Sequence, residues 1–217
     1  EIKICLDSWK RVLPDYEVRR WTYEDAKAIG CRFIDEALMA RKWAFAADVV
    51  RFYAVYKEGG VYMDSDILMK KRFDRFIPEH GFATFHEHIG QQLQLQAAFL
   101  MGEKGNAYCK AVFDYYNQRP FLKPDGTYDL TISPVVMLDM AYARGYKPED
   151  TEQHLEDGVV IYPGYYLTPC NRGVDVHPDA FALHTIYGSW RTRKLGRRIE
   201  LYVKHLFKVC RYLLFRR

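Results

Sequence analysis

The segment KEGGVYMDSDILMKK, residues 57–71, constrains the fold of this chain more than any other. Its glycines, Gly59 and Gly60, are a pair that ends a helix and turns the backbone, and the apolar residues after them predict a short strand over 61–64. Asp64 and Asp66 then stand at the carboxyl end of a strand that should be buried, where a carboxylate carries a desolvation cost unless a partner offsets it. A bound cation is the simplest partner, so the segment predicts a cation site.

The predicted strands and helices alternate along the 217 residues. Helices are predicted over residues 1–13, 22–28, 31–42, 43–58, 106–118, 134–144 and from 191 onward, and strands over 16–21, 61–64, 82–86, 96–101, 159–162 and 181–184. This alternation predicts an α/β fold, a mixed sheet sandwiched by helices, in one domain over 1–190 followed by a C-terminal helix over 191–217. Ligands of such sheets gather at the carboxyl ends of strands, which is where Asp64 and Asp66 stand.

Composition narrows the class of protein. Hydrophobic residues make up 49% of the chain and charged residues 28%, as in ordinary soluble globular proteins. The 5 cysteines are odd in number and none has a CxxC spacing, so a disulfide framework or a zinc knuckle is disfavoured and a reducing compartment is expected. No apolar run approaches the ~18 residues that span a bilayer, and no signal peptide is visible.

The positive charge is concentrated at the end of the chain. The net charge is +4, but residues 194–217 carry eight Lys or Arg against one Glu, which leaves the rest of the chain mildly acidic. Apolar residues recur in this tail at helical spacing: Leu195, Ile199, Tyr202, Leu206, Val209 and Leu213. A basic amphipathic helix is typical of an anchor on an anionic membrane surface, and the alternative is a terminal helix that packs on the core. No nucleic-acid recognition motif accompanies the charge, so nucleic acid is not an expected partner.

An Asp-x-Asp pattern alone has several interpretations. A calcium loop of the EF-hand type needs an oxygen ligand at its fifth position and glycine at its sixth, and Leu68 and Met69 occupy those positions here, so that interpretation fails. A phosphatase of the haloacid dehalogenase type continues into a Gly-Thr-like turn, which Ile67 and Leu68 do not match. For the bare motif, a pair of surface aspartates at a strand end is the favoured interpretation.

The predicted helix before the strand places a carboxylate beside its core-facing stripe. When the residues are placed at 100° intervals around the helix axis, the stripe consists of Phe45, Val49, Phe52 and Tyr56. Asp48 falls at its margin, and Arg51, three residues on, can reach it. Two interpretations stay open: an exposed ion pair within the helix, worth only ~0.3–0.5 kcal/mol, or a polar pair that faces a cleft beside Asp64.

The stretch AADVVRFYAVYKEGGVYMDSD, residues 46–66, closely resembles the DxD-containing sugar-binding region of glycosyltransferase family 32. The positions that match the pattern of that family are Asp48, Arg51, Tyr53, Gly59, Gly60, Tyr62, Asp64 and Asp66. Residues 8–21 and 183–190 resemble further family segments, and residues 131–138 resemble another in which Ser133 replaces the usual glycine. The strand that usually opens the family has no counterpart, so a segment before Glu1 is expected to be missing.

The resemblance implies a GT-A type fold and a divalent cation bound at the DxD motif. By this resemblance, Asp66 is expected to ligate the cation and Asp64 to bind both the ribose and the cation. His184 is expected to complete the metal shell. Mn²⁺ or Mg²⁺ suits carboxylate and phosphate oxygens, and an imidazole ligand favours Mn²⁺. The alternative for His184 is a structural role, in which the side chain only forms hydrogen bonds at the end of a strand.

The resemblance also implies a sugar-nucleotide donor, a UDP- or GDP-sugar. Asp48 and Arg51 touch the donor sugar and its phosphate and, with Asp64 and Asp66, form the expected catalytic group. The other expected donor-binding residues are Tyr62, Ser65, Ser189 and Trp190. No residue stands out as a covalent nucleophile, so same-face attack through an oxocarbenium-like state, with retention of configuration, is expected.

The expected function is that of a metal-dependent, retaining glycosyltransferase that moves a hexose to a glycan or lipid-linked glycan. We expect it to act in the synthesis of a bacterial capsule, lipopolysaccharide or exopolysaccharide. Its expected place is the cytoplasm, including the inner face of the plasma membrane. The alternative from another class is a non-catalytic module that binds a sugar nucleotide or a glycan on the same fold, and a phosphatase is a third hypothesis.

Overall fold

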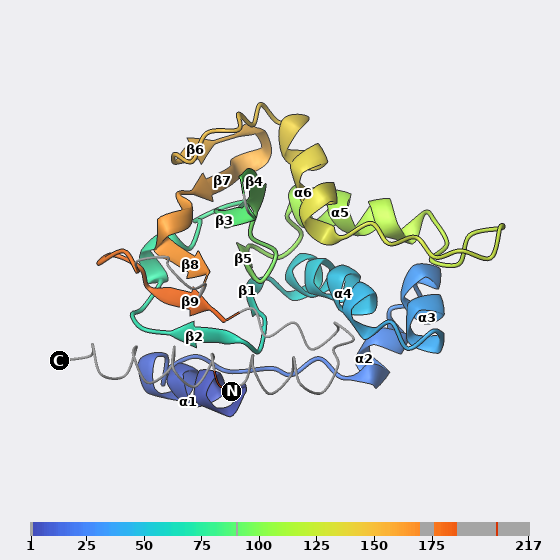
Figure 1. Cartoon of the computed structure of the whole chain (residues 1–217), viewed down its shortest axis with the longest axis horizontal. Coiled ribbons are helices and arrows are strands. Elements are labelled where there is room, and N and C mark those ends of the chain that lie inside the picture. The colour runs from blue at the N-terminus through green and yellow to red at the C-terminus, as the bar shows by residue number, and fades with distance from the viewer. Residues whose placement is uncertain (1, 90, 170–175, 186–202, 204–217) are drawn as a thin grey trace. The chain divides into compact units, whose positions relative to one another are not determined.

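The computed structural model describes residues 2–89, 91–169, 176–185 and 203 (Figure 1). The chain divides into a unit of residues 1–185 and a unit of residues 186–217, and the fold described here is that of the first unit. The predicted helix from residue 191 onward, and the candidate residues Ser189 and Trp190, lie outside the described residues. Within the described part, no helix is both long enough and apolar enough to cross a membrane.

The helices form close to where local signals predict them. Their bounds are α1 Ile2–Val12, α2 Tyr23–Ala28, α3 Arg32–Met39, α4 Trp43–Glu58, α5 Ala107–Asn117 and α6 Ser133–Tyr142. Short 3₁₀ helices cover η1 Asp74–Phe76, η2 Glu156–Gly158 and η3 Gly164–Tyr166. Thr22 caps α2 through a capping box with Asp25, and Asn106 caps α5 by accepting from the Cys109 N–H. At the end of α4, Gly59 has a φ of 73°, a conformation that side chains disfavour.

The strands form two sheets. The larger sheet has the order β1 (Gly60–Met63), β5 (Phe99–Gly102), β3 (Phe82–Ile89), β7 (Val159–Tyr162) and β6 (Gln153–His154), with β4 (Gln92–Leu95) paired to β3. Only the β3–β7 pair in this sheet is parallel. The smaller sheet has the order β2 (Ile67–Met69), β9 (Ala182–His184) and β8 (Leu167–Pro169). The predicted α/β class with a mixed sheet is confirmed.

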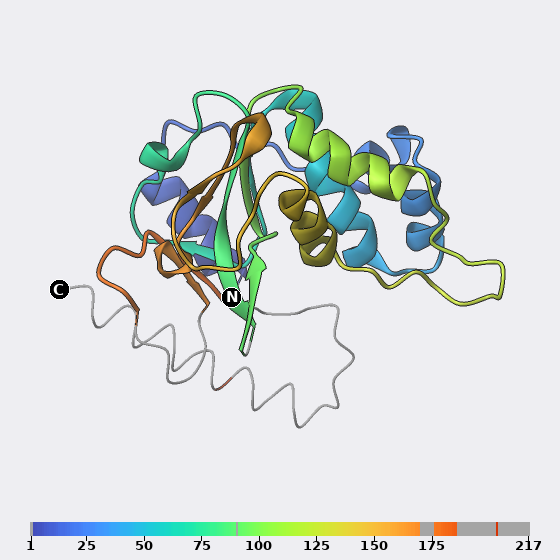
Figure 2. The same ribbon diagram turned by 90° about the horizontal axis from the view of Figure 1, so that it is seen from above.

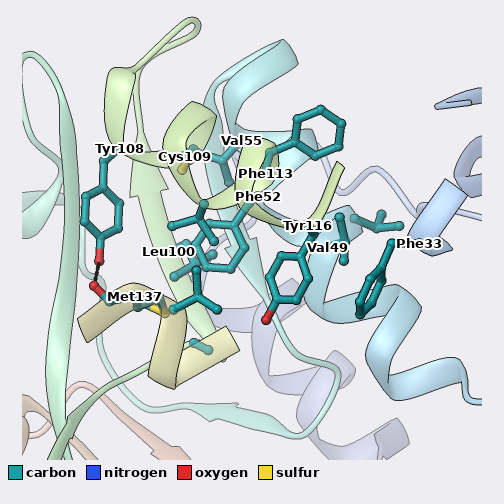
Figure 3. Close-up of a cluster of buried hydrophobic side chains, with 14 of the residues drawn as sticks. Phe33, Val49, Phe52, Val55, Leu100, Tyr108, Cys109, Phe113, Tyr116 and Met137 are labelled. Atoms are coloured by element: carbon teal, nitrogen blue, oxygen red, sulfur yellow. Dashed lines mark hydrogen bonds between the residues drawn. The ribbon is translucent and has the colours of Figure 1, made fainter. Parts of the chain in front are cut away.

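The larger sheet has a different cover on each face (Figures 1 and 2). Helices α4 to α6 pack on one face, and α3 packs on α4 and α5; the core there includes Phe33, Val49, Phe52, Val55, Leu100, Tyr108, Tyr116 and Met137 (Figure 3). The other face packs on the smaller sheet and on α1, and that core includes Trp9, Phe73, Phe76, Phe85, Phe99 and Phe181. Because side chains alternate along β3, Phe82 belongs to the first core and Ala83 and Phe85 to the second.

Two predicted strands differ from the structure. No strand forms over residues 16–21, where the backbone is irregular and Val18 is 59% exposed. Side chains hold this segment instead, since Tyr16 donates to Asp74 and Arg19 pairs with Glu58. The strand predicted over 96–101 begins only at Phe99, because residues 96–98 form a turn whose carbonyls accept hydrogen bonds from Arg51 and from the Asp64 N–H. The short strands β2, β4, β6 and β8 were not predicted.

Candidate active site at the end of the first strand

The candidate site lies where α4 passes over the end of β1. Arg51 on α4 is only 7% exposed, and its guanidinium contacts two carboxylates. Its Nη2 lies 3.0 Å from Asp48 Oδ1 and 3.6 Å from Asp64 Oδ1. Its Nη1 donates to the Ala97 carbonyl at 2.8 Å and its Nε to the Ala47 carbonyl at 3.3 Å. The pair of Asp48 and Arg51 is therefore largely buried, and Arg51 contacts the DxD motif, so the interpretation as an exposed ion pair within the helix is wrong.

Opposing effects act on the charges in this cluster. Burial alone would lower the pKa of Arg51, but the charges of Asp64 and Asp48 outweigh it, so the pKa is raised and the guanidinium stays charged. Burial raises the pKa of Asp48, while the charge of Arg51 and a hydrogen bond from Ser133 act in the opposite direction. That hydrogen bond runs from the Ser133 N–H, at the start of α6, to Asp48 Oδ2 at 3.1 Å. Asp48 is thus held from two sides, by α4 and by α6.

Asp64 belongs to this cluster because it directly follows β1 in the chain. Its own N–H donates to the Ala98 carbonyl at 2.9 Å, which fixes the backbone where the strand ends. The Tyr62 hydroxyl donates to Asp64 Oδ1 at 2.5 Å. Burial and the nearby charge of Asp64 raise the pKa of Tyr62 well above its usual range, so the hydroxyl keeps the proton that it donates. The other predicted donor-binding residue of this turn, Ser65, is exposed.

The remaining part of the site includes His184, at the end of β9. β2 pairs with β9 in a register that sets Ile67 opposite His184, so the turn that carries the DxD motif lies beside that histidine. Single ligand atoms of Asp64, Asp66 and His184 all lie within 4.8 Å of one another. His184 Nε2 is 3.6 Å from Asp66 Oδ1. The structure therefore brings together the three residues that the sequence analysis named as metal ligands.

This donor set fits a divalent cation. Two carboxylates and one imidazole nitrogen are the ligands that Mn²⁺ or a similar ion takes. The negative charge of the site also favours a cation, since Asp48, Asp64 and Asp66 outnumber the single guanidinium of Arg51.

Sequence reasoning missed two polar residues next to His184. Glu87, on β3, has its Oε1 3.4 Å from His184 Nδ1. Gln96, at the turn before β5, has its Nε2 3.4 Å from the same ring nitrogen. The strand predicted over 82–86 stops one residue short of Glu87. The alternation along that strand, extended by one residue, would have placed this carboxylate on the same face as Ala83 and Phe85.

The surroundings of His184 predict how stability depends on pH. Burial lowers its pKa, but the hydrogen bond to Glu87 and the charges of Asp66, Glu87 and Asp64 outweigh burial, so the pKa is raised above 6.5. A histidine whose pKa is raised by folding stabilises the protein fully below its unfolded pKa, and this contribution is lost as pH rises through the folded pKa.

In cation-free protein with a chelator present, we therefore expect the free energy of unfolding of the wild type to decrease from pH 6.5 upward. The His184→Gln variant should show a weaker decrease over the same range. Urea unfolding of both proteins, measured at intervals from pH 6 to pH 8.5, provides the comparison. Equal slopes would contradict the stabilisation of imidazolium by these carboxylates.

Comparisons with known proteins give the family context of this site. Residues 1–83 match the family described as glycosyltransferase sugar-binding region containing DXD motif. A curated protein of Acanthamoeba polyphaga mimivirus, described as an uncharacterized glycosyltransferase, is 26% identical over 153 residues. That match covers 68% of this chain but 58% of the viral protein, so the chain spans less than two thirds of this relative.

Two solved glycosyltransferase structures are also similar. The PaToxG glycosyltransferase has a TM-score of 0.46 at 18% identity, with 65% of this chain and 62% of that chain covered. A glycosyltransferase involved in the glycosylation of the major capsid of PBCV-1 has a TM-score of 0.42 at 14% identity, with 93% and 90% covered. The match over residues 1–83 and the similarity to the curated protein confirm the resemblance predicted from residues 46–66: this part of the chain is similar to the sugar-binding region of glycosyltransferases that contains a DXD motif.

Proposed function

We propose that this chain is a metal-dependent glycosyltransferase that moves a hexose from a UDP- or GDP-sugar to a glycan. One observation carries the proposal. Arg51 of α4 pairs with Asp48 and also contacts Asp64 of the DxD motif, and ligand atoms of Asp64, Asp66 and His184 lie close to one another. Groups suited to a sugar, a diphosphate and a cation therefore form one connected cluster.

In the proposal, Asp64, Asp66 and His184 hold the cation, and the imidazole favours Mn²⁺ over Mg²⁺. The cation, when bound, would neutralise negative charge that develops on the departing diphosphate. Backbone pairing holds two of these ligands, since the Asp64 N–H donates to the Ala98 carbonyl and the pairing of β2 with β9 sets His184 opposite Ile67.

In the proposal, Asp48 accepts hydrogen bonds from hydroxyls of the donor sugar, and Arg51 holds Asp48 and meets a phosphate oxygen. The contacts from α4 and α6 suit Asp48 to this task, because they fix the carboxylate before a substrate binds. Tyr62 orients Asp64 through its hydroxyl. Ser65, Ser189 and Trp190 make the other proposed contacts with the donor, as the family resemblance implies.

The proposal includes retention of configuration by same-face attack on an oxocarbenium-like sugar. A carboxylate tied to a guanidinium and to a backbone N–H, as Asp48 is, serves better as a fixed hydrogen-bond acceptor than as a covalent nucleophile. Determining the anomeric configuration of the product by NMR tests this step. An inverted product would overturn it.

The acceptor in the proposal is a glycan or lipid-linked glycan of a bacterial surface polysaccharide, at the inner face of the membrane. The family resemblance supports the glycan, and the basic residues of 194–217 support the membrane surface. Cosedimentation of the full chain with anionic and with neutral vesicles tests the location. Equal recovery with both kinds of vesicle would overturn it.

Removal of the cation tests the proposed function as a whole. We expect UDP- or GDP-sugars to raise the melting temperature only when Mn²⁺ is present, and EDTA to abolish both this shift and hydrolysis of the donor. The measurements are a thermal-shift screen and detection of released sugar. Stabilisation without hydrolysis or transfer would favour the non-catalytic binding module. Release of phosphate from simple esters would favour the phosphatase.

A further inference from the structure

A buried carboxylate outside the DxD motif faces the histidine of the site. Glu87 lies on β3 of the larger sheet and is 7% exposed, and His184 ends β9 of the smaller sheet. Glu87 Oε1 is 3.4 Å from His184 Nδ1, whereas Asp66 Oδ1 is 3.6 Å from His184 Nε2. The two carboxylates therefore contact opposite edges of one imidazole ring. Glu87 reaches the nitrogen that faces away from the DxD motif.

A second group competes for the same ring nitrogen. Gln96 Oε1 accepts a hydrogen bond from the Ala98 N–H at 2.9 Å, so the Gln96 side-chain amide is oriented with its NH₂ group toward His184 Nδ1, at 3.4 Å. An NH₂ group can only donate, and a carboxylate can only accept. In the neutral imidazole, Gln96 thus favours the proton on Nε2, while Glu87 favours the proton on Nδ1.

The two contacts have opposite consequences for the site. With the proton on Nδ1, Nε2 presents its lone pair toward Asp66 and can ligate a cation. With the proton on Nε2, that nitrogen has no free lone pair and cannot ligate a cation. A hydrogen bond to an ionised carboxylate is roughly twice as strong as one between neutral groups, so the contact with Glu87 should prevail.

We propose that Glu87 is a positioning residue that fixes His184 with Nε2 free to ligate the cation. The inference deepens the proposed function and rests on it. A carboxylate that accepts from the outer N–H of a ligating histidine orients the ring and raises its basicity, and loss of such a partner weakens metal affinity by roughly 10- to 100-fold. Glu87 thereby acts on the cation through His184.

The test measures the tautomer and the metal affinity separately. Nitrogen chemical shifts of His184 are recorded by NMR in cation-free protein, at a pH where the ring is neutral. Mn²⁺ affinity is measured by electron paramagnetic resonance. The variants are Glu87→Ala, Glu87→Gln and, as the reference for a lost ligand, His184→Ala. Asp150→Asn is the matched control, because Asp150 Oδ2 contacts, at 2.8 Å, Nε2 of His88, a histidine on the same strand as Glu87.

We expect wild-type His184 to carry its proton on Nδ1, and Glu87→Ala to move it toward Nε2 and weaken Mn²⁺ binding by about 10- to 100-fold. In Glu87→Gln the amide oxygen can still accept a hydrogen bond, so most of His184 should keep its proton on Nδ1 and Mn²⁺ affinity should fall less than in Glu87→Ala. This variant remains informative if the alanine variant does not fold. Asp150→Asn should behave as wild type.

Three outcomes would overturn the inference. An unchanged tautomer and Mn²⁺ affinity in both Glu87 variants would make Glu87 a structural residue and leave the proposed function intact. An unchanged Mn²⁺ affinity in His184→Ala would remove His184 from the ligands. Failure of the wild type to bind Mn²⁺ would contradict the proposed function itself, and it is recognised because it does not depend on any variant.

Discussion

Replacing Arg51 by methionine is expected to lower the free energy of unfolding by about 3–5 kcal/mol, the typical effect of breaking a buried ion pair. Methionine keeps much of the length of the side chain but removes the charge. Asp48 then loses its cation while its carboxylate stays largely covered, and the Ala97 carbonyl loses its donor. Urea unfolding at neutral pH, followed by extrapolation to water, measures the change.

Arg72→Met is the matched control for this experiment. Arg72 also contacts two carboxylates, those of Asp15 and Asp74, but its side chain is 43% exposed. Water solvates the charges there before and after the substitution, so the change in stability should be small. Equal losses in the two variants would show that burial of the Arg51 cluster does not contribute as described.

Asp48→Asn is expected to lower transfer and donor hydrolysis by about 100-fold or more, because a small misplacement of a reacting group has an effect of this size. The substitution keeps the shape of the side chain but removes its charge and turns one acceptor into a donor. The proposed cation ligands are other residues, so nucleoside diphosphate should still bind in the presence of Mn²⁺. Initial rates per folded molecule and calorimetry with UDP or GDP measure the two effects.

The control for this variant is Asp114→Asn, which removes the charge of a partly exposed carboxylate of α5 that pairs with Lys110. It should leave both rate and binding unchanged. If Asp48→Asn lowers stability but turns over normally, Asp48 serves only to support α4 and the start of α6. If nucleotide binding is lost together with turnover, Asp48 belongs to the nucleotide site rather than to the sugar site.

The parts of the fold that local chemistry determines could be predicted from the sequence. The Thr22 cap and the positive φ of Gly59 mark where α2 begins and where α4 ends, and each depends on residues only a few positions apart. The strands over 61–64 and 159–162 were predicted because compact apolar runs mark them. By contrast, β2 and β8 have three residues each, and a run of that length has no periodicity to detect.

The candidate site likewise has a part that local sequence spacing predicts and a part that depends on distant elements. Asp48, Arg51, Asp64 and Asp66 lie within one continuous stretch whose spacing identifies them. The contact of Glu87 with His184 could not be predicted, because it joins residues 97 positions apart in the sequence through the packing of two sheets. Other missed contacts also depend on distant elements, and they include those of Ser133 with Asp48 and of Ala97 with Arg51.

The strand pairing shows that the DxD region depends on strands outside it and is not an independent structural module. The family match ends at residue 83, yet β1 pairs with β5 and β2 pairs with β9, and both partner strands follow that residue. A fragment or graft that stops at the end of the family match would carry two strands without these partners. During synthesis, Asp66 of the motif likewise emerges from the ribosome 118 residues before His184. The boundary of sequence similarity is therefore not the boundary of a folding unit, and the motif acquires its geometry only when the end of the domain has been made.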